Sequence, residues 1–264
     1  MPEGDTIFKL AAFLQAGLAG RRLVGGTLRD NRAVDLTGSK ISDVYAHGKH
    51  LFIALDQGRL LRSHLGMWGS WHHYAPGEAW QRPARQASIV LDSGERIYVC
   101  FNALQVEMLR ERGVRARKLG IVLGPDLMAG DVDIDGIIER THAIGRPDRP
   151  VADLLLDQRV ACGIGNVYKS ETLFVERCHP ATPLSALDDA HLHTLFARAA
   201  DLLNANRRGG PRITRRAADE AGRLWVYGRT GKPCLQCDTS IASMLFGRGQ
   251  RSTYWCPQCQ PEPD

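Results

Sequence analysis

The chain has 264 residues, 44% of them hydrophobic, with a formal net charge of +5 and an isoelectric point near 8.9. This length allows a sizeable core and favours two domains. Apolar runs are too short for a membrane span of roughly 18 residues, and the polar N-terminus lacks the apolar region of a signal peptide. These features exclude a membrane or secreted protein, so we expect a cytoplasmic location.

The chain begins Met1-Pro2-Glu3-Gly4-Asp5. Removal of Met1 leaves Pro2 with a free secondary amine. Because an α-amino group has a reference pKa of about 8, an appreciable fraction is uncharged at neutral pH. Such an amine attacks an electrophilic carbon and forms an iminium, and Glu3 is one residue away. Many chains begin Met-Pro without any chemistry, so the dipeptide alone is weak support for a catalytic role.

The residues after Pro2 predict a helix. Its apolar face has spacings of three and four and consists of Ile7, Leu10, Ala11, Leu14 and Leu18. We expect a cap at Asp5 or Thr6 and a stop near Gly17 or Gly20. The Pro2 amine then lies at the positive end of a helix, which disfavours the protonated amine and attracts phosphate or sugar oxygens.

The first half of the chain predicts β structure. Short apolar or alternating runs cover residues 22–28, 41–45, 50–55, 60–64, 87–91 and 96–101. Residues 56–58 and 92–95 are expected to form hairpin turns between neighbouring strands. Strands at this spacing predict a sandwich or barrel. Lys49 is expected to open one strand beside Gly48, although an ordinary edge lysine explains it as well.

Charge is distributed unevenly along the chain. Residues 203–251 contain ten Lys or Arg and three Asp or Glu, whereas residues 125–157 contain eight acidic and three basic residues. We interpret the acidic stretch as a solvated linker and helix face. The basic C-terminal third is the side expected to bind nucleic acid.

Beyond residue 150 the sequence predicts helices over 151–160, 166–176 and 190–204, with a glycine-punctuated turn at 161–165. Asn166 is expected to cap the second helix. Its amide, together with Lys169 in the first turn, suits phosphate binding at a helix N-terminus. The simpler interpretation is a helical hairpin in which Asn166 is only a cap.

Four of the seven cysteines form two Cys-x2-Cys pairs separated by eighteen residues: Cys234, Cys237, Cys256 and Cys259. This spacing predicts one structural Zn²⁺ held by four thiolates, with no open position for catalysis. Two disulfides or an iron–sulfur cluster are the alternatives. Residues 243–255 predict a two-stranded ribbon with Arg251 at the exit of its turn. There Arg251 is either a phosphate ligand or a solvated surface arginine.

Four motifs resemble the formamidopyrimidine-DNA glycosylase and endonuclease VIII family. They occur in family order and span the chain: Pro2-Glu3-Gly4, Gly48-Lys49-His50-Leu51-Phe52, Gly163-Ile164-Gly165-Asn166-Val167-Tyr168-Lys169-Ser170-Glu171, and residues 250–260 of the ribbon. The resemblance implies an α+β multidomain fold with DNA bound in a cleft. Its expected parts are an N-terminal β-sandwich with a helix (2–122), an acidic linker (123–148), a helix-two-turns-helix domain (149–222) and a zinc finger (223–264).

The resemblance also implies a bifunctional DNA glycosylase and abasic-site lyase of base excision repair. Pro2 would attack C1′ of the damaged nucleotide, release the base and form a Schiff base, with Glu3 as general acid. Lys49 would contact phosphate and assist β-elimination, and Arg251 would assist δ-elimination. Asn166 and Arg251 would bind the phosphates beside the lesion. No redox cofactor is implied.

A damaged nucleotide must leave the base stack to reach Pro2, and a side chain must fill the gap. The family places such residues in the loop over 64–71, where we choose Met67 first and Trp68 second; ordinary hairpin packing is the alternative. Purine-directed members carry an Asp-Pro-Arg-Arg-Phe-Gly type stretch where this chain has residues 102–109. In this chain, residues 102–109 lack that stretch and resemble the endonuclease VIII branch, which predicts oxidised pyrimidines as substrates. Asp5-Thr6 replaces the Pro-Glu of many relatives.

Two hypotheses of other classes compete with the enzyme. A lesion-binding protein without catalysis has no physical need for Pro2, Glu3, Lys49 and Arg251 together. A zinc-ribbon RNA-binding protein has no use for a free N-terminal proline. We expect damaged double-stranded DNA as the partner, no membrane, and action as a monomer in the bacterial cytosol or nucleoid.

Overall fold

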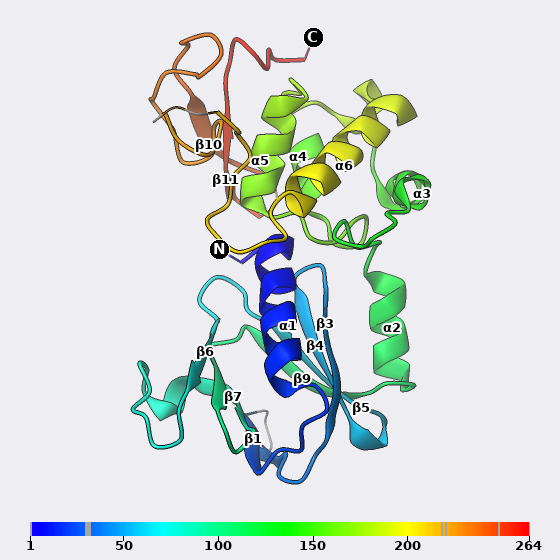
Figure 1. Ribbon diagram of the computed structural model, residues 1–264. Helices are drawn as coiled ribbons and strands as arrows, with labels where there is room; N and C mark the ends of the chain where they lie inside the picture. Colours follow the sequence, from blue (N-terminus) through cyan, green and yellow to red (C-terminus); the bar gives the residue numbers. More distant parts are fainter. Residues whose placement is uncertain (1, 30–32, 218, 220, 248, 264) are drawn as a thin grey trace. The chain divides into compact units, whose positions relative to one another are not determined.

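The computed structural model describes residues 2–29, 33–217, 219, 221–247 and 249–263, and the chain forms two compact units, residues 1–121 and 122–264 (Figure 1). In unit 1 a long helix precedes a series of short strands. The helices and strands described there are α1 (Gly4–Leu18), β1 (Gly25–Arg29), β2 (Ala33–Asp35), β3 (Ile41–His47), β4 (His50–Leu55), β5 (Arg59–His64), β6 (Ser70–Tyr74), β7 (Ala87–Asp92), β8 (Ile97–Phe101), β9 (Gln105–Arg110) and α2 (Val114–Val122).

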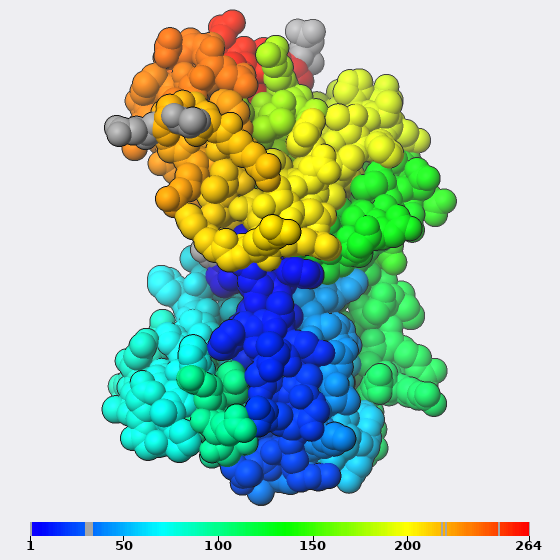
Figure 2. All heavy atoms as spheres, viewed as in Figure 1, coloured from blue at the N-terminus to red at the C-terminus, as the bar shows by residue number. Residues whose placement is uncertain are grey.

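The helix predicted after Pro2 is α1, and its apolar face is buried as expected. Ile7 and Leu18 are at most 1% exposed because they pack into the core of unit 1. The opposite face reaches the surface, where Phe13 is 46% exposed, and Figure 2 shows α1 as a surface strip of unit 1.

The cap of α1 is Glu3, whose main-chain oxygen accepts hydrogen bonds from the main-chain nitrogens of Thr6 (3.0 Å) and Ile7 (3.1 Å). The prediction of a cap at Asp5 or Thr6 is wrong, because both residues already belong to the first helical turn. The helix therefore begins closer to Pro2 than the sequence pattern predicts.

Two antiparallel sheets form the predicted sandwich. Their strand orders are β2-β1-β7-β8-β6 and β3-β4-β5-β9. Both sheets and α1 share one core, which includes the buried side chains of Leu28 in β1, Leu51 in β4 and Ile89 in β7. The turns predicted at 56–58 and 92–95 lie between paired neighbours, β4 with β5 and β7 with β8.

Several elements of unit 1 were not predicted, namely β2, β6, β9 and α2. In β9 the alternate residues Val106 and Met108 pack against the core shared with α1, and the other face carries Gln105, Glu107 and the buried Leu109. Polar and apolar residues therefore share that face, which weakens the strand signal in the sequence. The helix α2 covers part of the outer face of the second sheet through these apolar residues: Phe52, Leu60, Leu109, Ala116 and Leu119.

Unit 2 is helical and ends in a β-ribbon. Its described helices and strands are α3 (Ile134–Ile144), α4 (Val151–Leu156), α5 (Asn166–Val175), α6 (Asp189–Asn204), β10 (Ala242–Phe246) and β11 (Arg251–Trp255). The helix α5 packs against α4, α6 and β11, and α3 packs against α6 (Figure 1). Among the described residues, none of the helices combines the length and apolarity needed to cross a membrane.

The acidic stretch interpreted as a solvated linker and helix face contains the helix α3, which buries Ile137 and Ile138 and exposes Asp135 and Glu139. One expectation for unit 2 needs correction. The helix predicted over 151–160 ends at Leu156, because the Asp157 carboxylate accepts a hydrogen bond from the main-chain nitrogen of Arg159 (3.0 Å). Such a local side-chain contact competes with helix continuation.

Candidate nucleic-acid interface and metal centre

The start of α1 and the turn between β3 and β4 lie at the same end of unit 1. The helix runs antiparallel to β3. Two hydrogen bonds show this: Val44 N donates to Gln15 Oε1 (2.7 Å), and Gly20 N, after the end of the helix, donates to Ile41 O at the start of the strand (2.9 Å). From Val44 to the turn after β3 the chain covers about 13 Å, and from Gln15 back to the first turn of α1 the helix covers about 17 Å. The two lengths are similar, so the start of the helix and the turn lie at the same level. Pro2 and Glu3 are thus placed at the end of the sandwich that carries Lys49 (Figure 1).

Two buried carboxyl groups follow Pro2 within three residues of the chain. Glu3 is 0% exposed and Asp5 is 2% exposed, whereas Pro2 is half-buried. The Asp5 carboxylate lies 3.7 Å from the Lys9 ammonium one helical turn later. The first turn of α1 thus carries a buried acidic side chain, Asp5, two residues after Glu3.

Lys49 was expected to open a strand. In the structure it lies in the tight turn before β4. His47 and His50 are paired across β3 and β4, so Gly48 and Lys49 form a two-residue hairpin turn. Gly48 has φ +56°, a left-handed conformation that favours glycine in such turns. The half-buried Lys49 is thereby fixed at the tip of the hairpin.

A row of polar side chains beside this turn was missed by the sequence analysis. Arg62, only 8% exposed, donates from Nε to His50 Nδ1 (3.2 Å) and through its Nη atoms to Glu107 Oε2 (2.6 Å) and Gln105 Oε1 (2.5 Å). The His64 ring lies 4.9 Å from the His50 ring. Because arginine only donates, His50 Nδ1 accepts and Nε2 carries the proton. These residues meet only through strand register, and no local motif signals them.

Both imidazoles in this row are uncharged at neutral pH. Burial, followed by repulsion from Arg62, lowers the pKa of His50 to about 3. Burial, followed by repulsion from Lys49, lowers the pKa of His64 to about 4. Repulsion from His47 and Lys49 lowers the pKa of His50 further.

Lowering the pH from 7 to 5 is expected to destabilise unit 1. A histidine in the unfolded chain has a pKa of about 6.5. His50 and His64 have lower pKa values when folded, so the unfolded state binds more protons in this window and stability falls with pH. The expected loss is about 2 kcal/mol for each histidine. Thermal unfolding of a His50→Gln, His64→Asn variant should show a smaller loss; an equal loss would contradict this assignment.

The loop after β5 holds the two candidate gap-filling residues. Met67 is 54% exposed and Trp68 is 77% exposed. Because His64 at the end of β5 pairs with His50 at the start of β4, this loop begins at the end of the sandwich that carries Lys49. Large exposed side chains at this end suit the predicted insertion into DNA, which stays a prediction.

In unit 2, the first turn of α5 contacts the ribbon. The cap is Gly165, so the prediction of a cap at Asn166 is wrong. Instead, Asn166 Nδ2 donates to the Ser252 main-chain oxygen (2.6 Å), and Asn166 Oδ1 accepts from Lys169 Nζ (2.7 Å). Lys169 Nζ also donates to Thr253 Oγ1 (2.6 Å) and the residue is 1% exposed, an arrangement that does not support the predicted direct DNA contact by Lys169.

Arg251 is the first residue of β11, and it is exposed as its predicted role requires. It lines a groove of about 610 Å³ together with charged residues from the α4 region. There Asp157 accepts from Arg149 (3.0 Å) and Arg159 (2.7 Å). Burial alone would raise the pKa of Asp157, but the hydrogen bonds from Arg159 and Arg149 lower it to about 2.

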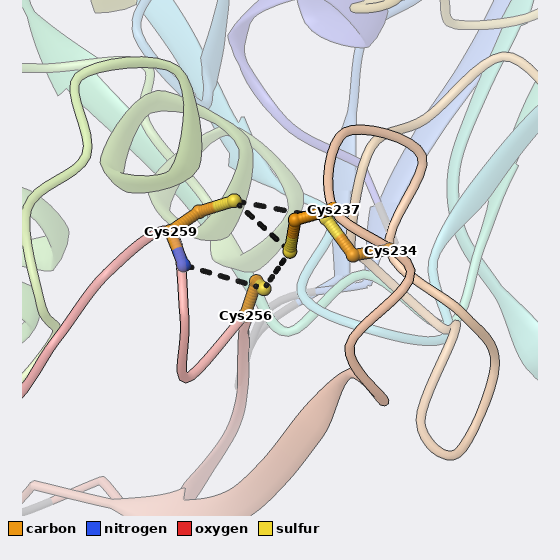
Figure 3. Close-up of side chains that lie close together, drawn as sticks. All are labelled: Cys234, Cys237, Cys256 and Cys259. Carbon is orange, nitrogen blue, oxygen red and sulfur yellow. Dashed lines mark hydrogen bonds between the residues drawn. The ribbon is translucent and has the colours of Figure 1, made fainter.

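The four paired cysteines converge on one point (Figure 3). Their sulfur atoms lie within 4.8 Å of one another, and three of the separations are 3.4 Å (Cys237–Cys256), 3.5 Å (Cys237–Cys259) and 3.9 Å (Cys234–Cys259). These values are too long for disulfides, whose sulfurs lie about 2.05 Å apart. A tetrahedral Zn²⁺ with bonds of about 2.3 Å needs sulfur separations of about 3.8 Å, so the donor set fits zinc.

A second feature missed by the sequence analysis is the Glu171 carboxylate. It is 0% exposed and accepts hydrogen bonds from the main-chain nitrogens of Trp225 (2.8 Å), Val226 (2.9 Å) and Tyr227 (2.8 Å). It also accepts from the Thr214 hydroxyl. The carboxylate, which belongs to α5, therefore holds residues 225–227, and this segment leads into the cysteine cluster. Its signal in the sequence is only an acidic residue at the end of the motif over 163–171.

Comparisons with known proteins cover almost the whole chain. Family models match residues 1–103 (formamidopyrimidine-DNA glycosylase N-terminal domain), 123–216 (formamidopyrimidine-DNA glycosylase H2TH domain) and 231–261 (zinc finger found in FPG and IleRS). The probable endonuclease 8 2 of Streptomyces coelicolor is 40% identical over 100% of this chain and 95% of its own. The DNA-(apurinic or apyrimidinic site) lyase Nei2 of Mycolicibacterium smegmatis is 38% identical over 98% and 99%. The Lactococcus lactis Fpg in complex with abasic-site DNA shares the fold, with a TM-score of 0.82 at 21% identity over 99% and 100% of the two chains.

Proposed function

The chain belongs to the formamidopyrimidine-DNA glycosylase and endonuclease VIII family of DNA glycosylase/lyases, and we propose that it excises oxidised pyrimidines from double-stranded DNA and cleaves the resulting abasic site. The observation that carries this proposal is the arrangement at one end of unit 1. Pro2, the buried Glu3 and the Lys49 turn lie at that end. A nucleophilic amine, a carboxyl group and a cation are the groups that the reaction needs.

In the proposed reaction, the Pro2 nitrogen bonds to C1′ of the damaged nucleotide as the glycosidic bond breaks. The base leaves with the bonding electrons and takes up a proton, and Glu3 donates the proton that opens the sugar ring. The resulting iminium makes the C2′ hydrogen acidic, so its removal expels the 3′ phosphate by β-elimination. Lys49 binds the phosphate at this step, and Arg251 assists the later δ-elimination of the 5′ phosphate.

The pyrimidine preference rests on the chain after β8. Purine-directed members carry a distinctive stretch there, whereas this chain forms β9, whose Gln105 and Glu107 bind Arg62. That strand is committed to the sheet, so it does not supply an arginine and an aromatic to the opposite DNA strand. The naming of similar relatives as endonuclease 8 proteins agrees with this branch.

One structural Zn²⁺ is proposed at Cys234, Cys237, Cys256 and Cys259, where it would hold the base of the ribbon. Four thiolates fill its coordination sphere, so it would supply structure and not chemistry. The ribbon then presents Arg251, and α5 presents Asn166, to the phosphates beside the lesion.

Borohydride reduction of the protein with duplex DNA tests the proposal, using one duplex with an abasic site and one with 5-hydroxyuracil. We expect a covalent complex with both, because reduction traps the iminium after base release. A complex with the abasic site alone would remove the pyrimidine assignment and leave a lyase. Binding without any complex would favour the lesion-binding protein without catalysis.

A further inference from the structure

The Lys169 amine lies in the interior of unit 2, where the residue is 1% exposed. We propose that Lys169 is a positioning residue that orients the Asn166 amide and holds the start of β11, and so places the two phosphate-binding groups of unit 2. This inference rests on the proposed function, because it assigns the phosphate contacts to Asn166 and Arg251. Burying an ammonium without hydrogen bonds is costly, so the two oxygens that it contacts define its place in the fold.

The first part of the argument is the orientation of the Asn166 amide. Lys169 Nζ donates to the Asn166 side chain at 2.7 Å, and the atom that accepts is the amide oxygen. The Ser252 main-chain oxygen only accepts, so the atom 2.6 Å from it must be the nitrogen. Two partners of opposite character therefore fix the amide, and one hydrogen of Nδ2 is left over for a phosphate oxygen. Without the Lys169 amine, the Asn166 oxygen loses the donor that holds it, which favours a flip that would turn the acceptor outward.

The second part is the position of Arg251. Ser252 and Thr253 are the two residues that follow it in β11, and both are tied to the first turn of α5, one by Asn166 and one by Lys169. Thr253 is 0% exposed, so this contact lies inside the unit. A strand held at its second and third residues has little freedom at its first. The place of the Arg251 guanidinium thus depends on a lysine three residues after Asn166 in α5.

The test is the affinity of the full-length, zinc-loaded protein for a duplex with a stable abasic-site analogue, measured over a range of salt concentrations. Lys169→Met keeps the aliphatic stem and removes the amine. We expect it to weaken binding about tenfold, because the two phosphate-binding groups that Lys169 places are no longer held. Lys40→Met, which removes an exposed charge at the opposite end of β3 from Lys49, is the matched control and should bind like the wild type.

A double-mutant cycle separates positioning from general damage to the fold. Asn166→Ala and Lys169→Met should each weaken binding, and the double variant should be no weaker than the worse single variant. Additive losses would overturn the proposal.

If Lys169→Met fails to retain zinc, Thr253→Val carries the test. It removes one of the two oxygens that Lys169 binds and should weaken binding several-fold, and wild-type affinity would overturn the proposal. Failure here is distinct from failure of the proposed function. If the wild type forms the borohydride complex and Lys169→Met binds DNA normally, only the role of Lys169 is refuted. If the wild type forms no complex, only the catalytic assignment is refuted.

Discussion

A protein that retains one residue in front of Pro2 is expected to lose the borohydride-trapped DNA complex by about 10³-fold or more, the scale of losing a catalytic nucleophile. An added residue converts the Pro2 amine into an amide, whose nitrogen lone pair is delocalised into the carbonyl group and does not attack carbon. Glu3 and Lys49 stay in place in such a protein. The measurement is single-turnover trapping on abasic-site DNA, comparing the extended protein with one that begins at Pro2.

Two controls accompany this experiment. Pro2→Gly keeps a free α-amine and is expected to form a complex, which shows that the amine and not the ring is essential. The affinity of the extended protein for duplex DNA should stay within about twofold of wild type, since the phosphate-binding groups proposed above lie elsewhere. If the extended protein still forms the complex, the nucleophile is either the α-amine of the added residue or a lysine, of which Lys49 at the same end of unit 1 is the first candidate.

Features with local spacing could be predicted from the sequence. The cysteine pairs predict a metal site because each Cys-x2-Cys turn presents two sulfurs to one ion, and the four sulfurs do converge in the structure. The face of α1 could be predicted because Ile7 and Leu18 repeat with helical period and bury the same side. In both cases, residues close together in the chain decide the arrangement.

Features that depend on tertiary contacts could not be predicted. The pairing of Arg62 with Glu107 requires the register of β5 and β9, which no short stretch of sequence specifies. Asn166 was predicted as a cap because asparagine favours that position, but the fold uses its amide between Ser252 and Lys169. There the contact with a distant strand overrides the local preference, and that contact defines the proposed phosphate site.

Replacing a cysteine of the cluster is the second change with a large expected effect. Cys237→Ser removes a sulfur that lies 3.4 Å from Cys256 and 3.5 Å from Cys259. The ribbon has a small core, so its folding should depend on the metal, and structural zinc contributes about 10–16 kcal/mol to folding in zinc-finger peptides. We expect loss of bound zinc and a loss of DNA affinity of about 10²-fold, because Arg251 is carried by the ribbon. Metal analysis and DNA binding measure both effects.

The matched control is Cys178→Ser, which removes a thiol of unit 2 that lies outside the cluster and should leave one zinc per chain. Retention of zinc by Cys237→Ser would contradict four-cysteine coordination, and iron in the purified protein would favour the iron–sulfur alternative. Formation of the covalent complex separates an effect on DNA binding from an effect on the reaction. Since Pro2 and Glu3 belong to unit 1, the zinc-free protein should still form the iminium when DNA is supplied far above its weakened dissociation constant. A zinc-free protein that binds DNA at such concentrations but forms no iminium would show that the ribbon contributes to the chemistry itself and not only to holding the DNA.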